Sequence, residues 1–185
     1  MALKSTICKA LLQIADMERN YFQDHTLTIA RHPSETDERM MVRLLAFALH
    51  ADQDLVFGKG VSDEDEPDLW LKDLTGAIRL WIDIGQPDEK RMRRTCGRAD
   101  QVFVYAYRGQ GTELWWKKTA ADIERCENLT VMQLPYEACK TLAKLADRNM
   151  QLNCTVQEGQ LWLANAAESV LVEPVVLKDA TKAPR

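Results

Sequence analysis

The residues best suited to chemistry in this chain are acids, and Asp83 is the most unusual of them. It stands alone in an otherwise apolar stretch formed by Leu80, Trp81, Ile82 and Ile84. A carboxylate buried without a partner costs several kcal/mol or takes up a proton. Asp83 therefore needs a partner, which could be a divalent metal ion, a second carboxyl group or an arginine.

Asp68 is the second candidate, because the alternation of side chains predicts a hairpin over residues 68–84. A turn is expected at 74–76, and the aliphatic residues of both strands share one face. Aligning those faces puts Asp68 directly opposite Asp83. Two carboxylates at that separation repel unless they share a proton or a cation. The same register pairs Leu71 with Leu80, Leu69 with Ile82 and Lys72 with Arg79.

Glu38 is the third candidate, on a helix expected over 35–51. Ser34 is a suitable N-cap, and acids follow in the first turn. Glu38 lies on the same side as the apolar stripe, whereas Glu35 and Asp37 are expected to face water. Glu38 could also serve only to stabilise the positive end of the helix. The stripe consists of Met41, Leu44, Leu45, Ala48 and Leu49.

A basic helix is expected to begin at Pro87 and to continue to about Ala99, where a strand over 101–107 follows. A strand, a helix and a strand in succession predict a parallel crossover. The helix carries the densest run of basic residues in the chain, and they form either a solvated face or a surface that contacts phosphate. Residues 62–66 are expected to form a solvated acidic loop. The basic residues of the expected helix are Lys90, Arg91, Arg93, Arg94 and Arg98.

The remaining segments predict a mixed α and β fold in one domain over residues 1–178. The last residues, 179–185, are expected to be a flexible tail. Strands from both ends of the chain are expected to add antiparallel sheet to the core. Strands are predicted over 3–15, 25–31, 129–134, 150–156, 160–164 and 170–177, and a helix over 135–147.

Composition and motifs limit the partners, the compartment and the cofactors to be expected. The net charge of −4 and the pI of about 5.5 argue against a protein coated with basic residues for general nucleic-acid binding. Five scattered cysteines without a Cys-x-x-Cys pair are typical of the reducing cytoplasm. No apolar run approaches the roughly 18 residues that a membrane span needs. Glycine-rich nucleotide motifs are absent from the sequence, so no organic cofactor is expected.

Five strings of residues are specific enough to carry a family resemblance. They are Arg31-His32-Pro33-Ser34-Glu35-Thr36, Glu38-Arg39-Met40-Met41, Asp65-Glu66-Pro67, Leu80-Trp81-Ile82-Asp83-Ile84-Gly85 and Pro87-Asp88-Glu89. With these strings the chain resembles the YaeQ family of small bacterial proteins over nearly its whole length. That family is similar in fold to PD-(D/E)xK nucleases, around a variant of their motif. On this resemblance Pro67-Asp68 looks like the PD pair, Asp83 looks like the second acid, and Gly85 falls where the lysine would be.

The resemblance implies Mg²⁺ or Mn²⁺ bound by Asp68 and Asp83, with Glu38 assisting and Lys90 or Arg91 holding a phosphate of DNA or RNA. Such a metal would generate a nucleophilic water for phosphodiester hydrolysis. Gly85 and the acidic net charge favour an alternative, a catalytically inactive nuclease fold that binds protein or nucleic acid. A third hypothesis makes Asp83 purely structural and pairs it with Arg39, Arg43 or Arg79.

Overall fold

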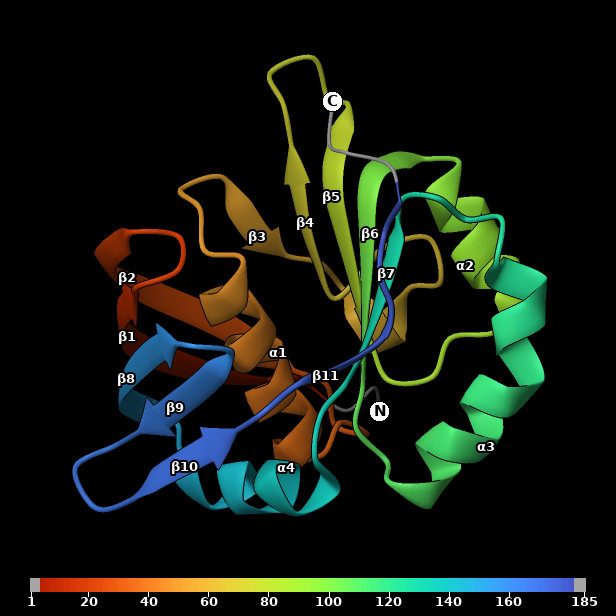
Figure 1. The fold of residues 1–185 in the computed structure, drawn as a ribbon. Helices are drawn as coiled ribbons and strands as arrows, with labels where there is room; N and C mark the ends of the chain where they lie inside the picture. The colour runs from red at the N-terminus through yellow and green to blue at the C-terminus, as the bar shows by residue number, and fades with distance from the viewer. Residues whose placement is uncertain (1–3, 182–185) are drawn as a thin grey trace. The chain divides into compact units, whose positions relative to one another are not determined.

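The computed structural model describes residues 4–181, and these fold into two compact units (Figure 1). The first unit contains the described residues up to Ala51 together with Glu137–Pro174. The second unit contains Asp52–Tyr136 and the described residues from Val175 onward. Each unit has its own β-sheet, and the chain passes from one unit to the other three times, after Ala51, Tyr136 and Pro174.

Among the described residues, the first unit has a five-stranded sheet in the order β10-β9-β8-β1-β2. β1 pairs with β2 in antiparallel fashion and with β8 in parallel. Alternate residues of β1 are buried, which marks one apolar face for packing, and α1 contacts this strand. The elements are β1 (Thr6–Asp16), β2 (Tyr21–Arg31), α1 (Asp37–Leu49), α4 (Tyr136–Leu142), the 3₁₀ turn η3 (Ala143–Leu145), β8 (Asn149–Gln157), β9 (Gln160–Ala164) and β10 (Ser169–Val172).

Within the described residues, the second unit has a six-stranded sheet in the order β11-β7-β6-β5-β4-β3. Strands β5, β6 and β7 run parallel, whereas β3, β4 and β5 form an antiparallel meander. The elements are β3 (Leu55–Phe57), the turn η1 (Gly60–Ser62), β4 (Leu69–Lys72), β5 (Ile78–Ile84), α2 (Glu89–Cys96), β6 (Ala99–Ala106), α3 (Gln110–Thr119), η2 (Ala120–Ile123), β7 (Leu129–Gln133) and β11 (Val175–Lys178).

One face of the second sheet packs against α2 and η2. Trp81 of β5 lies in this core with Met92 of α2 and Ile123 of η2, and all three are fully buried. Because side chains alternate along a strand, the residues two positions from Trp81 on β5 share its face. Asp83 therefore points to the side of the sheet on which α2 lies.

The structure confirms the hairpin β4–β5, the parallel crossover from β5 to β6, the antiparallel pair β1–β2 and the hairpin β8–β9. The added sheet is mixed rather than antiparallel, because β1 and β8 run parallel. The strand predicted over 170–177 is wrong, because β10 and β11 belong to different sheets. Pro174 lies between them, and proline cannot donate to a strand ladder.

Helices α1 and α2 each begin two residues later than predicted, at Asp37 instead of residue 35 and at Glu89 instead of Pro87. Thr36, not Ser34, caps α1, and its hydroxyl accepts from the Arg39 N–H. Asp88 caps α2, so Pro87 precedes the helix rather than opening it. The single domain over residues 1–178 stays a prediction, and residues 182–185 of the expected tail lie outside the described residues.

Candidate functional site

Asp68 and Asp83 lie side by side at the end of the β4–β5 hairpin. The structure has the predicted pairs Leu69–Ile82 and Leu71–Leu80. The Asp68 N–H donates to the Ile82 carbonyl at 3.0 Å, and Oδ2 of Asp68 accepts from the Ile84 N–H at 2.8 Å. Each of the two aspartates is only 3% exposed. Asp68 is thus hydrogen-bonded to both neighbours of Asp83 and its charge acts on Asp83, while their direct pairing on one face stays a prediction.

The lower end of the hairpin differs from the predicted register. An irregularity after Leu71 places Lys72 opposite Ile78 instead of Arg79. The ammonium of Lys72 lies 3.5 Å from the centre of the Trp70 ring, a cation–π contact. Lys72 is therefore turned to an aromatic partner and not to the acids.

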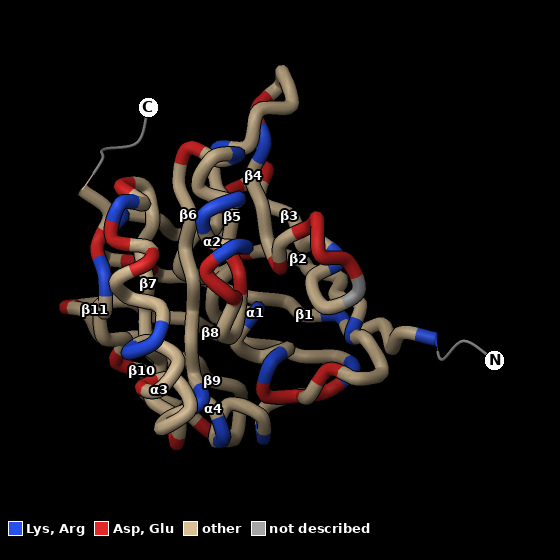
Figure 2. Tube along the Cα trace, turned by 90° about the vertical axis from the view of Figure 1, so that its right-hand side faces the viewer, with Lys and Arg blue, Asp and Glu red and all other residues tan. Residues whose placement is uncertain are grey.

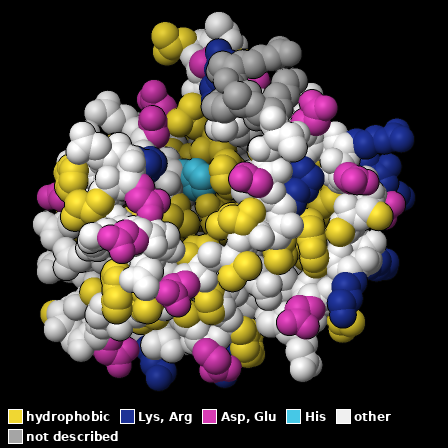
Figure 3. All heavy atoms as spheres, viewed as in Figure 1, with side chains coloured by type: hydrophobic (Ala, Val, Ile, Leu, Met, Phe, Trp, Pro, Cys, Tyr) yellow, Lys and Arg dark blue, Asp and Glu magenta, His cyan; other side chains and the backbone are white. Residues whose placement is uncertain are grey.

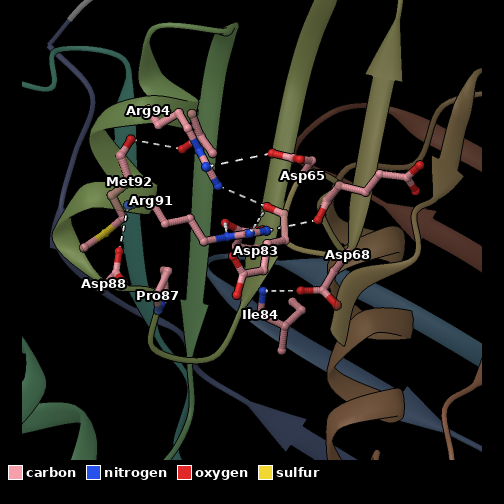
Figure 4. Close-up of polar contacts among 12 residues, drawn as sticks. Asp65, Asp68, Asp83, Ile84, Pro87, Asp88, Arg91, Met92 and Arg94 are labelled. Atoms are coloured by element: carbon pink, nitrogen blue, oxygen red, sulfur yellow. Dashed lines mark hydrogen bonds and ion pairs between the residues drawn. The ribbon is translucent and has the colours of Figure 1, made fainter. Parts of the chain in front are cut away.

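Arg91 of α2 is the partner of Asp83 (Figure 4). Its Nε donates to Oδ2 of Asp83 and its Nη2 donates to Oδ1, each at 2.8 Å. The bidentate geometry gives two charge-assisted hydrogen bonds in one plane. The hypothesis that paired Asp83 with Arg39, Arg43 or Arg79 is therefore wrong in its partners, although an arginine does hold this carboxylate. Arg39 and Arg43 bind Glu35, and Arg79 binds Asp73 and Asp100.

Several contacts hold Arg91 in this position. The Asp88 side chain accepts from the Arg91 N–H at 2.7 Å and so fixes the first turn of α2. Met92, the next residue, is fully buried in the core under the helix. The indole of Trp115 donates to the Pro87 carbonyl at 2.8 Å, which fastens the chain just before α2. The guanidinium thus approaches Asp83 from a helix that is anchored at both its cap and its buried face.

Burial and charge act in opposite directions on the pair. Burial raises the pKa of Asp83, Arg91 lowers it, and the negative charge of Asp68 raises it again, with a net upward shift. The hydrogen bonds to Asp83 raise the pKa of Arg91. The arginine therefore stays protonated, and ionised Asp83 depends on it.

Arg91 also binds the segment that precedes β4. Residues 63–66, Asp-Glu-Asp-Glu, are here named the acidic segment. Arg91 donates to the carbonyl oxygens of Glu64 and Glu66, and Arg94 donates to that of Glu64 at 3.2 Å. The carboxylate of Asp65 lies 3.8 Å from Arg94 (Figure 4). The expected solvated loop is thus attached to α2 by the backbone.

Gly85 occupies the position where the resemblance expected a lysine. Its φ is +108°, in the left-handed half of conformational space that favours glycine. A Cβ built there meets no atom within 4 Å, so backbone conformation and not space opposes a side chain. The turn from β5 toward α2 therefore requires glycine at this point.

The residues of the site do not fit a divalent metal ion as they stand. Both oxygens of Asp83 are engaged by a guanidinium, and Oδ2 of Asp68 accepts a backbone hydrogen bond. A metal ion at Asp83 would face the positive charge of Arg91. In the part of the chain that the structure describes, no group of three or more His, Cys, Asp or Glu side chains is placed to hold a metal ion.

The remaining predicted site residues are Glu38, which belongs to the other unit, and Lys90, which stands next to Arg91 on α2. Glu38 belongs to α1 in the first unit, where its charge adds to burial in raising the pKa of Cys139 to about 12. Lys90 is exposed and lines a cavity of about 280 Å³. The other residues of this cavity are Glu64, Asp88, Arg91 and Arg94. Lysine and arginine side chains gather on this edge of the second unit, over α2 and α3 (Figure 3).

The sequence interpretation missed a buried ion pair in the first unit. Glu35, expected to face water, is 5% exposed and binds Arg43 at 2.6 Å and Arg39 at 3.1 Å. Glu35 precedes the first turn of α1 because Thr36 is the cap, so helical periodicity does not govern its direction. The available signal was the spacing of Arg39 and Arg43, which puts both cations on one face of α1.

Comparison with known proteins places this chain among bacterial relatives. The family model described as YaeQ protein matches residues 1–174. The chain belongs to the YaeQ family. The relatives from Salmonella typhi and Escherichia coli K12 are both described as uncharacterized protein YaeQ, and both are 43% identical to this chain. The alignment covers 94% of this chain and 96% of the Salmonella protein, and 89% and 91% for the Escherichia coli protein.

Two solved YaeQ structures have the same fold. The crystal structure of YaeQ from Xanthomonas axonopodis pv. citri superposes with a TM-score of 0.92 at 49% identity, over 94% of this chain and 98% of that one. The structure from Pseudomonas syringae superposes with a TM-score of 0.92 at 34% identity, over 96% and 98%. The family and its two-sheet α+β fold are thereby established. Among the described residues, no helix is both long and apolar enough to span a membrane.

Proposed function

We propose that the second unit is a PD-(D/E)xK-like core that binds a phosphodiester backbone without cleaving it. The observation that carries this proposal is the bidentate hold of Arg91 on Asp83, because it neutralises the carboxylate that a catalytic metal would need. Gly85 supports it, since a lysine at this left-handed position would be strained. The site retains the acids of a nuclease but uses one of them to fix a basic helix.

The proposed binding surface is α2. Figure 2 shows lysine and arginine concentrated along this helix. Arg91 is neutralised by Asp83, whereas Lys90 and Arg93 are exposed on the same short helix. Cations on an exposed face bind phosphate without reading base sequence, and their affinity falls as salt rises. We therefore expect weak, salt-dependent binding to DNA or RNA.

Binding is tested with fluorescein-labelled single-stranded and duplex oligonucleotides by fluorescence anisotropy. The variant Lys90→Gln/Arg93→Gln should weaken binding roughly tenfold at low salt and reduce the salt slope, as loss of about two phosphate contacts predicts. Lys140→Gln/Lys144→Gln is the matched control, with the same change of charge on exposed lysines of the first unit. Equal affinity of both variants would contradict α2 as the binding surface.

Metal-dependent hydrolysis is the alternative, and the adjacency of Asp68 and Asp83 favours it. It is tested by the shift in melting temperature that Mn²⁺ produces in the wild type and in Asp83→Ala. Equal curves, and intact DNA and RNA after incubation with Mn²⁺, are the results expected for a binding protein. A gain of stability in the wild type alone, together with cleavage, would favour the nuclease.

A further inference from the structure

The acidic segment, residues 63–66, lies against arginines of α2 that neighbour the proposed phosphate contacts Lys90 and Arg93. Its backbone is fixed by Arg91, which donates to the carbonyls of Glu64 and Glu66, and by Arg94, which donates to that of Glu64. The segment has no regular secondary structure of its own. The carboxylates of Asp63 and Glu66 lie 3.7 and 3.6 Å from Lys59, whereas that of Asp65 faces Arg94 and Arg98. Glu64 contributes to the wall of the 280 Å³ cavity together with Lys90, Arg91 and Arg94.

The side-chain contacts of the segment are weak enough to exchange. Asp65 lies 3.8 Å from Arg94 and 4.0 Å from Arg98, and its side chain is 76% exposed. Exposed ion pairs of this kind contribute little to stability because water screens them. Phosphate oxygens accept from the same guanidinium donors and carry comparable charge. A ligand can therefore take the place of Asp65 without breaking the fold.

We infer that the acidic segment is an internal competitor for a linear polyanion on α2, an inference that rests on the phosphodiester binding proposed above. The adjacent carboxylates of Glu64 and Asp65 have the sign and the close spacing of the charges of a nucleic-acid strand. When the segment covers Arg94 and Arg98, it lowers the affinity of α2 for phosphate. Strands with dense charge displace it, whereas isolated anions compete poorly. The segment thus allows a ligand to bind α2 only if the charge density of that ligand is high enough to displace it.

The test removes charge from the segment and leaves its backbone anchors in place. The variant Glu64→Gln/Asp65→Asn keeps both side-chain sizes, and the carbonyls that bind Arg91 and Arg94 are unaffected. The matched control is Asp52→Asn/Asp54→Asn, two exposed residues of the same unit with the same change of net charge. The amide oxygen introduced by Asp52→Asn can still accept the hydrogen bond that Asp52 accepts from the Asp54 N–H. Urea unfolding should show that both variants are folded.

Anisotropy titrations with a labelled oligonucleotide measure the effect. The Glu64/Asp65 variant should bind about threefold to tenfold more tightly than the wild type at low salt, and the control should differ by less than about twofold. The gain should largely vanish near 1 M salt, where the Debye length is about 3 Å.

The outcomes separate the two proposals. Binding by none of the three proteins would refute phosphodiester binding, and the competition with it. Equal affinity of the wild type and the Glu64/Asp65 variant would refute the competition and leave the binding proposal intact. A control that gains as much affinity as the variant would trace the effect to net charge, and would also refute the competition.

Discussion

Replacing Arg91 with methionine tests the central contact of the site. Methionine keeps much of the length of the side chain but removes the only cation that the structure places against both oxygens of Asp83 among the described residues. Breaking a buried ion pair from one side costs about 3–5 kcal/mol, because the remaining charge is left uncompensated. The side chains of Arg91 and Asp83 are 20% and 5% exposed, so we expect the lower end, about 3 kcal/mol at pH 7.

The loss is measured by urea unfolding followed by tryptophan fluorescence. Four of the five tryptophans, residues 70, 81, 115 and 116, lie in the second unit, so the signal reports mainly on this part of the chain. Arg93→Met is the matched control on the same helix, where the side chain is 53% exposed and pairs with Glu89 at 3.3 Å. It should change the free energy of unfolding by less than about 0.5 kcal/mol. The urea dependence, m, should stay the same in both variants.

The pH dependence of the Arg91→Met deficit gives a sharper test. Burial raises the pKa of Asp83 in the folded protein, and removal of Arg91 raises it further, because the arginine lowers it. A carboxyl group with a raised folded pKa contributes stability below its unfolded pKa of about 3.9, and loses it as pH rises through the folded value. The deficit should therefore be largest at pH 7 and shrink toward pH 4. A deficit below about 1 kcal/mol at pH 7, or one that does not change with pH, would refute the reasoning.

Three further predictions concern residues around the site and in the first unit. Burial and a nearby arginine lower the pKa of His50 to about 3. The protein should therefore become less stable as pH falls below about 6.5, by roughly 1–2 kcal/mol at pH 5. In urea unfolding, His50→Gln should reduce this loss of stability. Gly58→Ala should destabilise by about 3 kcal/mol or more, because its Cβ would lie 2.2 Å from a backbone oxygen. Gly97→Ala, where the nearest atom is 3.5 Å away, should leave the melting temperature nearly unchanged. Gly85→Lys should cost about 1–3 kcal/mol in urea unfolding through backbone strain and should confer no Mn²⁺-dependent cleavage of labelled DNA.

The hairpin of the site could be predicted because side-chain alternation fixes register. Matching the aliphatic faces of β4 and β5 leaves one alignment, and that alignment places Asp68 beside Asp83. The parallel crossover to β6 followed from the order of strand, helix and strand. These features depend on residues that are close in sequence, where periodicity carries most of the information.

The partner of Asp83 could not be predicted by the same reasoning. The sequence offered arginines on several elements, and each could have reached a buried carboxylate. The choice of Arg91 depends on where α2 begins, because Asp88 rather than Pro87 sets the first turn and thereby the direction of each later side chain. A shift of one residue in a helix turns a side chain by about 100°. The position of the helix cap therefore determines which arginine pairs with Asp83, and composition and spacing alone do not reveal it.

The Arg91–Asp83 pair links the two roles proposed for α2. A guanidinium that is neutralised by a buried carboxylate adds little to anion binding, but it fixes the helix on which the exposed cations stand. Its remaining donors hold the acidic segment beside those same cations. Loss of Arg91 should therefore release the segment and loosen the helix together. In Arg91→Met, release of the segment should raise the affinity for nucleic acid and loosening of the helix should lower it. Glu64→Gln/Asp65→Asn should show the rise in affinity alone, because it leaves the ion pair intact.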